Sequence, residues 1–280
     1  MKLGAHLSIA GGLETAPRLA REHKMTAFQI FSKNQRQWVA KPLTDREIES
    51  FRTEIKNAFS PDVIVHSGYL INLCSTNPQI QKLSLNAFID ELERCEQLEI
   101  KYFVFHPGSH LGSGEDKGLK KVAESVQTAI KKLKTDKIQI LIEITAGQGT
   151  NLGYKFEHIK QLIEMIDSPL IGVCFDTCHA FASGYDITTK EYYEKTMALF
   201  DNVIGLKYLK AFHLNDSKGK IRSRIDRHEH IGKGFLTLEP FKLLINDSRF
   251  TNHPGVIETP GGISMDVQNL STLSKLKDER

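Results

Sequence analysis

A carboxylate and an imidazole stand three residues apart at the point where an apolar run of the chain ends. The run 171–175 has the composition of a buried β-strand, Asp176 follows it directly, and His179 comes three residues later. In parallel α/β proteins the carboxyl ends of the strands carry the chemistry, because that edge is open while the strands are packed. One such pair could equally be a helix cap and a packed histidine. Its repetition along the chain favours a functional site.

Six predicted strands and one loop supply His, Asp or Glu side chains in this way. The nine residues are His66, His106, Glu143, Asp176, His179, His213, Asp226, His228 and Glu258. So many convergent nitrogen and oxygen ligands would repel one another or stay unsatisfied without cations between them. Imidazoles mixed with carboxylates suit Zn²⁺, with Mn or Fe as alternatives. Nine ligands exceed the needs of one tetrahedral ion and therefore predict two or three ions.

Eight short β-like runs must position these side chains. The predicted strands are 3–7, 27–31, 63–66, 102–106, 138–144, 171–175, 209–214 and 256–258. Apolar residues recur every three to four positions between them, for example from Leu85 to Cys95 and from Leu119 to Leu133, which predicts amphipathic helices. Alternating strands and helices predict an α/β protein, a single (β/α)8 TIM barrel over residues 1–280, with the active site at the C-terminal ends of the strands. A doubly wound open sheet is the alternative fold.

Composition places the chain among cytoplasmic globular proteins. No run approaches about 18 apolar residues, which predicts that the chain neither spans nor binds a membrane. The N-terminal segment is too short and polar for a signal peptide and reads as the first strand. The four cysteines form no CxxC pair and are too few for a disulfide scaffold, which predicts a reducing compartment. A net charge of +3 permits a phosphate partner, and nothing demands more than a monomer.

We predict that the other histidines and a glycine-rich stretch are not metal ligands. We predict that His23, His158 and His253 lie at the surface, and that His6, His110 and His230 at most support the ligands. The segment 147–153 has the spacing GxGxxxG, one residue longer than the dinucleotide fingerprint. We expect its glycines to let the backbone pass close to the metal site or the substrate instead.

A basic segment and two loops indicate a nucleic-acid substrate. The basic side chains within 207–233 are Lys207, Lys210, Lys218, Lys220, Arg222, Arg224, Arg227 and Lys233. Interleaved with candidate ligands, they could hold phosphates beside the ions, although a charged run alone is more often a solvated loop. Trp38 follows the second strand, and Tyr69 and Leu70 follow His66. Planar or apolar side chains at an active face suit a protein that wedges into a base stack, although each could also be local core.

Seven motifs in order then resemble the endonuclease IV family of zinc-dependent apurinic/apyrimidinic (AP) endonucleases. They are NQRQW at 34–38, YLINL at 69–73, FHPGSH at 105–110, TAGQGTNLG at 145–153, GVCFDTCHAFASGYD at 172–186, HLNDSK at 213–218 and SRIDRHEHIGKG at 223–234. The likeness extends over essentially the whole chain. Ile144 departs from it, because close relatives are expected to carry Asn there, and Ser67 and Gly68 stand at a variable point. None of these departures removes a ligand.

The resemblance implies a barrel that hydrolyses duplex DNA on the 5′ side of an abasic site, leaving a 3′-hydroxyl and a 5′-deoxyribose phosphate. One zinc would take His66, His106 and Glu143, a second Glu143, Asp176, His213 and Glu258, and a third His179, Asp226 and His228. Glu143 and Glu258 would be the catalytic carboxylates, with a metal-bound hydroxide as the nucleophile. Gln35, Arg36, Tyr69, Leu70 and Arg227 would bind the DNA.

Two rival functions stay open at this point. A metal-dependent sugar isomerase or epimerase of similar barrel fold also gathers His and carboxylates, but it would leave the basic segment and Arg36 unexplained. A damage-binding protein with structural zinc would need no catalysis, although structural zinc sites are normally closed by cysteines. Assays on damaged DNA and free sugars separate these functions.

Overall fold

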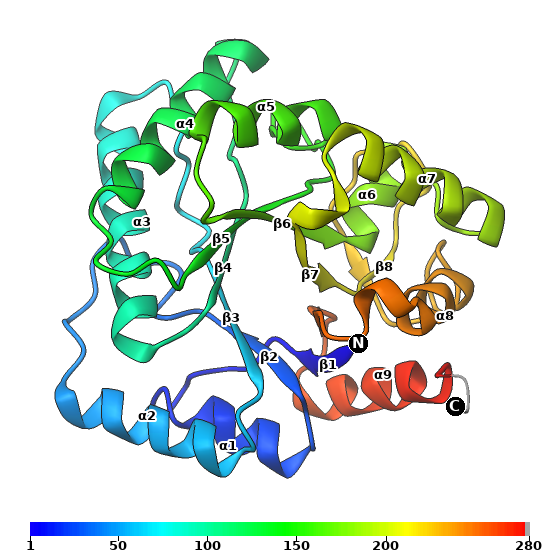
Figure 1. Ribbon diagram of the computed structural model, residues 1–280, viewed down its shortest axis with the longest axis horizontal. Helices are drawn as coiled ribbons and strands as arrows, with labels where there is room; N and C mark the ends of the chain where they lie inside the picture. The colour runs from blue at the N-terminus through cyan, green and yellow to red at the C-terminus, as the bar shows by residue number, and fades with distance from the viewer. Residues whose placement is uncertain (278–280) are drawn as a thin grey trace.

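Eight parallel strands form one sheet in the computed structural model, which describes residues 1–277. They are β1 (Lys2–Ala5), β2 (Ala27–Ile30), β3 (Asp62–His66), β4 (Tyr102–Phe105), β5 (Gln139–Glu143), β6 (Ile171–Asp176), β7 (Leu209–His213) and β10 (Pro254–Ile257). The hydrogen-bonded order runs β1-β10-β7-β6-β5-β4-β3-β2. A parallel bridge between His6 and Gln29 brings the two edge strands together, so the sheet closes into a barrel (Figure 1).

The seam between β1 and β2 depends on a glycine. A Cβ atom on Gly4 would lie 1.6 Å from the carbonyl oxygen of Ala27. This oxygen belongs to the backbone of β2 and cannot move away by a side-chain rotation. Small and apolar side chains fill the barrel interior, where Ala27, Ala211 and their neighbours form a cluster separate from the larger core under the helices. Closure therefore requires the absence of a side chain at position 4.

Helices surround the barrel and cover its outer face (Figure 1). They are α1 (Thr15–Glu22), α2 (Asp45–Asn57), α3 (Pro78–Leu98), α4 (Glu115–Ile130), α5 (Phe156–Ile166), α6 (Thr177–Ser183), α7 (Lys190–Val203), α8 (Glu239–Asn246) and α9 (Ile263–Lys275), with 3-10 turns η1 (Leu206–Tyr208) and η2 (Ser248–Phe250). Capping residues in the sequence determine where two of these helices begin. Thr44 and Glu47 form a capping box before α2, and Asn77 caps α3, whose first residue is Pro78. None of the helices within residues 1–277 is long and apolar enough to cross a membrane.

The predicted barrel is confirmed, and the doubly wound alternative is wrong. Each predicted strand overlaps an observed one, and the two apolar stripes fall on α3 and α4, except that Leu133 lies beyond the end of α4. The sequence did not reveal a two-stranded antiparallel ribbon, β8 (Asp216–Ser217) with β9 (His228–Glu229). This ribbon pairs two parts of the segment between β7 and α8, and it carries one candidate ligand, His228.

Candidate metal centre

The nine predicted ligands gather at the C-terminal end of the barrel. Chain direction explains this, because His66, Glu143, Asp176 and His213 are each the last residue of a parallel strand. Asp176 also caps α6, where one carboxylate oxygen accepts a hydrogen bond from the backbone N–H of His179 at 2.7 Å. The first turn of α6 thus fixes the positions of both Asp176 and His179.

Glu143 is fully buried at the centre of the site. One of its oxygens lies 3.0 Å from His66 Nε2 and 3.1 Å from His106 Nε2. The other lies 3.0 Å from His213 Nδ1 and 3.1 Å from His179 Nδ1. Four imidazoles around one carboxylate give Glu143 the geometry of a bridging group.

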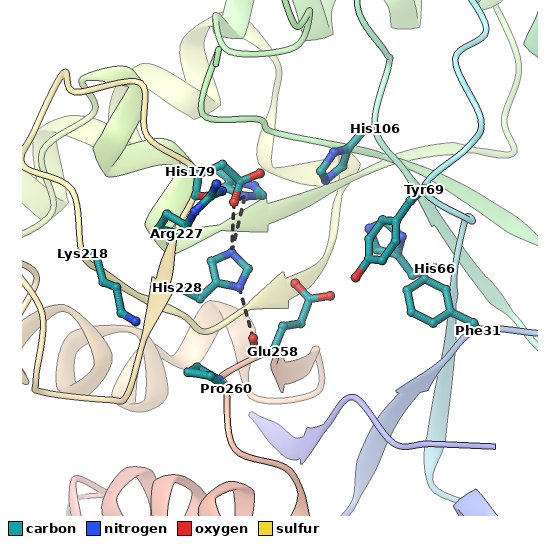
Figure 2. A pocket seen from close by; sticks show the side chains of 11 residues that line it. Phe31, His66, Tyr69, His106, His179, Lys218, Arg227, His228, Glu258 and Pro260 are labelled. Atoms are coloured by element: carbon teal, nitrogen blue, oxygen red, sulfur yellow. Dashed lines mark hydrogen bonds and ion pairs between the residues drawn. The ribbon is translucent and has the colours of Figure 1, made fainter. Parts of the chain in front are cut away.

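The remaining ligands extend the cluster toward solvent. Asp226 Oδ1 lies 3.1 Å from His179 Nε2, and the two imidazole nitrogens His179 Nε2 and His228 Nε2 are 3.4 Å apart. Glu258 Oε2 lies 3.2 Å from His213 Nδ1. Figure 2 shows His179, His228 and Glu258 on one side of the cavity, with His66 and His106 opposite.

Backbone carbonyls contact one ring nitrogen in three of the five imidazoles and so help to orient those rings. His66 Nδ1 pairs with the carbonyl of Ser67 at 2.8 Å, and His179 Nδ1 with the carbonyl of Ile144 at 3.0 Å. His228 Nδ1 pairs with the carbonyl of Glu258 at 3.2 Å. Donation to a carbonyl leaves the other nitrogen unprotonated and free to bind a metal. Ile144 serves through its backbone, so this departure from the family pattern leaves the hydrogen bond intact.

Gln29 and Asn215 complete the site, and the sequence analysis missed both. The Gln29 amide donates to Glu258 Oε1 at 2.6 Å and accepts from His213 Nε2 at 2.8 Å. Asn215 donates to Asp176 Oδ2 at 2.7 Å, and its carbonyl oxygen accepts from the backbone N–H of Glu258 at 2.7 Å. A polar residue inside an otherwise apolar strand was the available signal for Gln29.

Electrostatics in this cluster favour positive charge around the carboxylates. Burial opposes ionisation of Glu143, but His213 and His106 outweigh it and hold the pKa of this carboxyl well below its ordinary value. Burial likewise opposes protonation of His179, yet Asp176 and Asp226 raise its pKa well above the ordinary value. The carboxylates that raise the pKa of His179 would equally favour a bound metal cation.

Among the described residues, four groups have donor atoms that all lie within 4.8 Å of one another, and one of them combines Asp176, Cys178 and His228. The three groups made only of the predicted ligands are His66, His106 and Glu143; Glu143, Asp176, His213 and Glu258; and His179, Asp226 and His228. Their members match the three sets implied by the resemblance, and Glu143 belongs to two of them. Donor types, oriented rings and spacing all fit Zn²⁺, while occupation of each group stays a prediction.

A cavity of about 400 Å³ opens over the cluster. Its lining adds Phe31, Tyr69, Lys218, Arg227 and Pro260 to the candidate ligands (Figure 2). Of the residues assigned to DNA, Tyr69 is 73% exposed and Leu70 37% exposed. Gln35 and Arg36 line an adjoining cavity, which shares Phe31 with the first. Phe31 was also missed, and its ring contacts those of Tyr69 and His66.

Other expectations need correction. His158 is not at the surface: it is 4% exposed and binds Glu115 at 3.1 Å. His253 is half-buried, and its Nε2 contacts the Leu209 carbonyl at 3.0 Å. Lys207 and Lys210 lie in η1 and early in β7, away from the site, because the ligands sit at the other end of that strand.

The histidines that were expected at most to support the ligands differ in their distance from the site. His6 lies 3.8 Å from Glu258 and 2.9 Å from Gln29, beside the ligands. His110 instead binds the backbone of Gly114, and His230 pairs with Asn269. In the glycine stretch, a Cβ on Gly153 would stand 3.3 Å from the Glu143 carbonyl oxygen, so the chain does pass close to the site there.

The fold and the cluster define a (β/α)8 barrel with a His and carboxylate centre suited to several metal ions. A family model described as "Xylose isomerase-like TIM barrel" matches residues 17–275. The chain is 46% identical over 278 residues to a probable endonuclease 4 of Chloroflexus aurantiacus, covering 98% of each chain. A probable endonuclease 4 of Geobacter sulfurreducens is 46% identical over 281 residues, covering 99% of this chain and 95% of the other.

Solved structures agree with these matches. Endonuclease IV from Thermus thermophilus superposes with a TM-score of 0.88 and 32% identity, covering 99% of this chain and 98% of that one. The chain belongs to the endonuclease IV family. A D-tagatose 3-epimerase-like protein superposes with a TM-score of 0.75 at 21% identity, which shows a shared fold alone.

Proposed function

We propose that this protein is a DNA-repair endonuclease that hydrolyses the phosphodiester bond 5′ to an abasic site in duplex DNA. The products are a 3′-hydroxyl and a 5′-deoxyribose phosphate. The observation that carries the proposal is the Glu143-centred cluster of nine ligands, which opens into a cavity bordered by Lys218, Arg227 and Tyr69. Family membership supports the same activity. A site built for a free sugar would not require exposed basic and aromatic side chains on its rim.

Three zinc ions would occupy the three donor groups, with Mn²⁺ as a substitute. Six positive charges would then face the four carboxylates of the cluster, and the excess attracts an anionic phosphodiester. When bound, zinc lowers the pKa of a coordinated water to about 7 and neutralises charge on the phosphate. Such charge neutralisation is what slow phosphate-ester hydrolysis needs most.

Glu143 and Glu258 have different tasks in this proposal. Glu143 is fully buried and holds four imidazoles, so it fixes the geometry of the centre. Glu258 borders the cavity. Burial opposes its ionisation, but His213 outweighs that effect and holds its pKa well below the ordinary value. An ionised carboxylate at this wall can accept a hydrogen bond from the attacking water and orient it toward the phosphorus.

The exposed residues near the mouth would bind the DNA. Arg36 and Arg227 carry charges for backbone phosphates, and Gln35 offers an amide to phosphate or base edges. Tyr69 and Leu70 present planar and apolar groups that can enter the stack where the abasic nucleotide leaves a gap. Base stacking on such side chains contributes about 1–3 kcal/mol per base.

We also propose that the protein works as a single-domain monomer in the cytoplasm. All four cysteines are free and buried, which supports a reducing compartment. Burial also raises the pKa of the Cys74 and Cys178 thiols to about 12, so they resist oxidation. Size-exclusion chromatography with light scattering measures the oligomeric state.

The test is incision of a short duplex that carries one abasic site, by zinc-loaded and chelator-stripped protein, with sizing of the product ends. We expect chelator-sensitive cleavage on the 5′ side that leaves a 3′-hydroxyl. Glu143→Gln should abolish cleavage and lower the zinc content. The matched control is Glu115→Gln, which removes a carboxylate that also binds an imidazole, that of His158, outside the cluster. Intact duplex after incubation with protein that holds its zinc would refute the proposal, and turnover of free sugars would select the isomerase.

A further inference from the structure

A cluster of four charged side chains, three of them buried and that of Asp90 38% exposed, lies behind the two loops proposed to contact DNA. The first loop, residues 31–44, joins β2 to α2 and carries Arg36; the second, residues 67–77, joins β3 to α3 and carries Tyr69. The charge cluster comprises Lys33 of the first loop and Asp90, Glu91 and Arg94 of α3. The side chains of Lys33, Glu91 and Arg94 are 3%, 3% and 5% exposed. No metal ligand belongs to this cluster.

The charge cluster fixes the first loop at several points. Lys33 Nζ lies 2.6 Å from Asp90 Oδ2 and 3.6 Å from Glu91 Oε1. It also donates to the backbone carbonyl of Trp38 at 3.2 Å. Arg94 pairs with Asp90 at 3.3 Å and donates to the backbone carbonyl of Lys41. Side chains of α3 and of Lys33 thus hold the loop on both sides of the exposed Arg36.

The same glutamate fixes the second loop. Glu91 Oε2 accepts a hydrogen bond from the backbone N–H of Gly68 at 3.1 Å, directly before Tyr69. A Cβ on Gly68 would lie 3.2 Å from Glu91 Oε1 and 3.5 Å from Gln35 Cα. The two loops therefore meet at Gly68 and Gln35, with Glu91 bound to both through its two oxygens. The buried charges make a flexible arrangement costly, because an unpaired charge in this position would lose its solvation.

We propose that Glu91 is a positioning residue that holds the two loops as one unit in the free protein, so that Arg36 and Tyr69 meet DNA in a preset spacing. The inference rests on the proposed function for its consequence in DNA binding, but the coupling of the loops is independent of it. A preorganised pair of loops spends less binding free energy on ordering when DNA arrives. Loosening the unit should therefore weaken binding without altering the chemistry at the metals.

The sequence supplies a reporter, since Trp38 is the single tryptophan of the chain and lies on the first loop. Two variants perturb the unit from different sides. Glu91→Leu removes both of its contacts, whereas Gly68→Ala adds only volume between Glu91 and Gln35. Glu91→Gln keeps an acceptor for the Gly68 N–H and should show a smaller effect. The control is Asp247→Asn. Asp247 lies between α8 and β10, far from the charge cluster in sequence, and its carboxylate binds Arg249 and Tyr193.

For Glu91→Leu and Gly68→Ala we expect lower Trp38 fluorescence anisotropy in the free, zinc-loaded protein. On the abasic duplex, KM should rise about tenfold for Glu91→Leu, with kcat within about twofold and zinc content unchanged. Asp247→Asn should lower Tm without moving anisotropy or KM. Unchanged anisotropy and KM in both variants, with only Tm lowered, would overturn the inference. If wild-type protein cut no abasic DNA, the proposed function would fail, and anisotropy alone would still decide whether the loops are coupled.

Discussion

Replacing Gln29 with leucine should lower the affinity for zinc although it replaces none of the nine candidate ligands. Gln29 is fully buried on β2, and its amide binds Glu258 and His213 at the same time. Leucine has a similar volume but can neither donate nor accept. The His213 Nε2–H would lose its acceptor, and Glu258 would lose its shortest hydrogen bond.

The magnitude follows from the two groups left behind. A buried polar group without its partner costs about 1–3 kcal/mol, so two such groups should lower the free energy of unfolding by about 2–6 kcal/mol. Loss of a residue that orients metal ligands typically reduces metal affinity about 10–100-fold. At about 1.4 kcal/mol per tenfold change, that reduction equals about 1.4–2.8 kcal/mol. The loss of unfolding free energy and the loss of zinc-binding free energy are separate quantities, and both are large enough to measure.

The assay is competition for zinc with a chromogenic chelator, together with zinc stoichiometry. Gln29→Glu should also weaken binding, since it keeps an acceptor for His213 but places a second carboxylate against Glu258. The control is Gln139→Leu, the same change at the other end of the barrel, where the amide contacts only a backbone carbonyl at 3.5 Å. Folded Gln29→Leu with zinc affinity within about twofold of wild type would refute the reasoning.

Three further predictions concern stability. Gly4→Ala should cost about 3 kcal/mol or more in urea unfolding, because its Cβ would meet backbone at the barrel seam; a loss below about 1 kcal/mol would contradict the seam. Burial raises the pKa of Asp266 from 3.8 to about 6, so wild type loses stability as pH rises through that window. Asp266→Asn should gain up to about 3 kcal/mol relative to wild type between about pH 4 and 7, and a pH-independent difference would disprove this. Chelation should lower Tm, since a ligand at 100 times its Kd contributes about 2.7 kcal/mol; an unchanged Tm after verified zinc loss would argue against a loaded centre.

The barrel could be predicted because periodicity and strand ends are local properties of the sequence. An apolar run that ends in His66 or Glu143 identifies both the strand and the edge on which its side chain stands. The grouping of nine such residues then follows from the parallel sheet alone. Their occupation by ions does not follow from the fold, and it stays a prediction.

The errors have a common physical origin in contacts between distant segments. His158 has helical spacing that suits a surface position, but its partner Glu115 lies 43 residues away on another helix. Gln29 stands out only as a polar residue in an apolar strand, and its role depends on His213 at the end of β7 and on Glu258 directly after β10. The β8–β9 ribbon consists of two-residue strands, too short for any periodicity to indicate.

The position of β10 in the sheet has a consequence for synthesis of the protein. Among the strands within residues 1–277, β10 is synthesised after all the others, yet it lies between β1, the earliest of them, and β7. The strands β1 to β7 are therefore all synthesised before β10, and Glu258 is missing from the cluster at that stage. The complete centre therefore cannot form before residue 258 has been synthesised, and a chain that ends earlier lacks a carboxylate that the proposed hydrolysis of DNA requires.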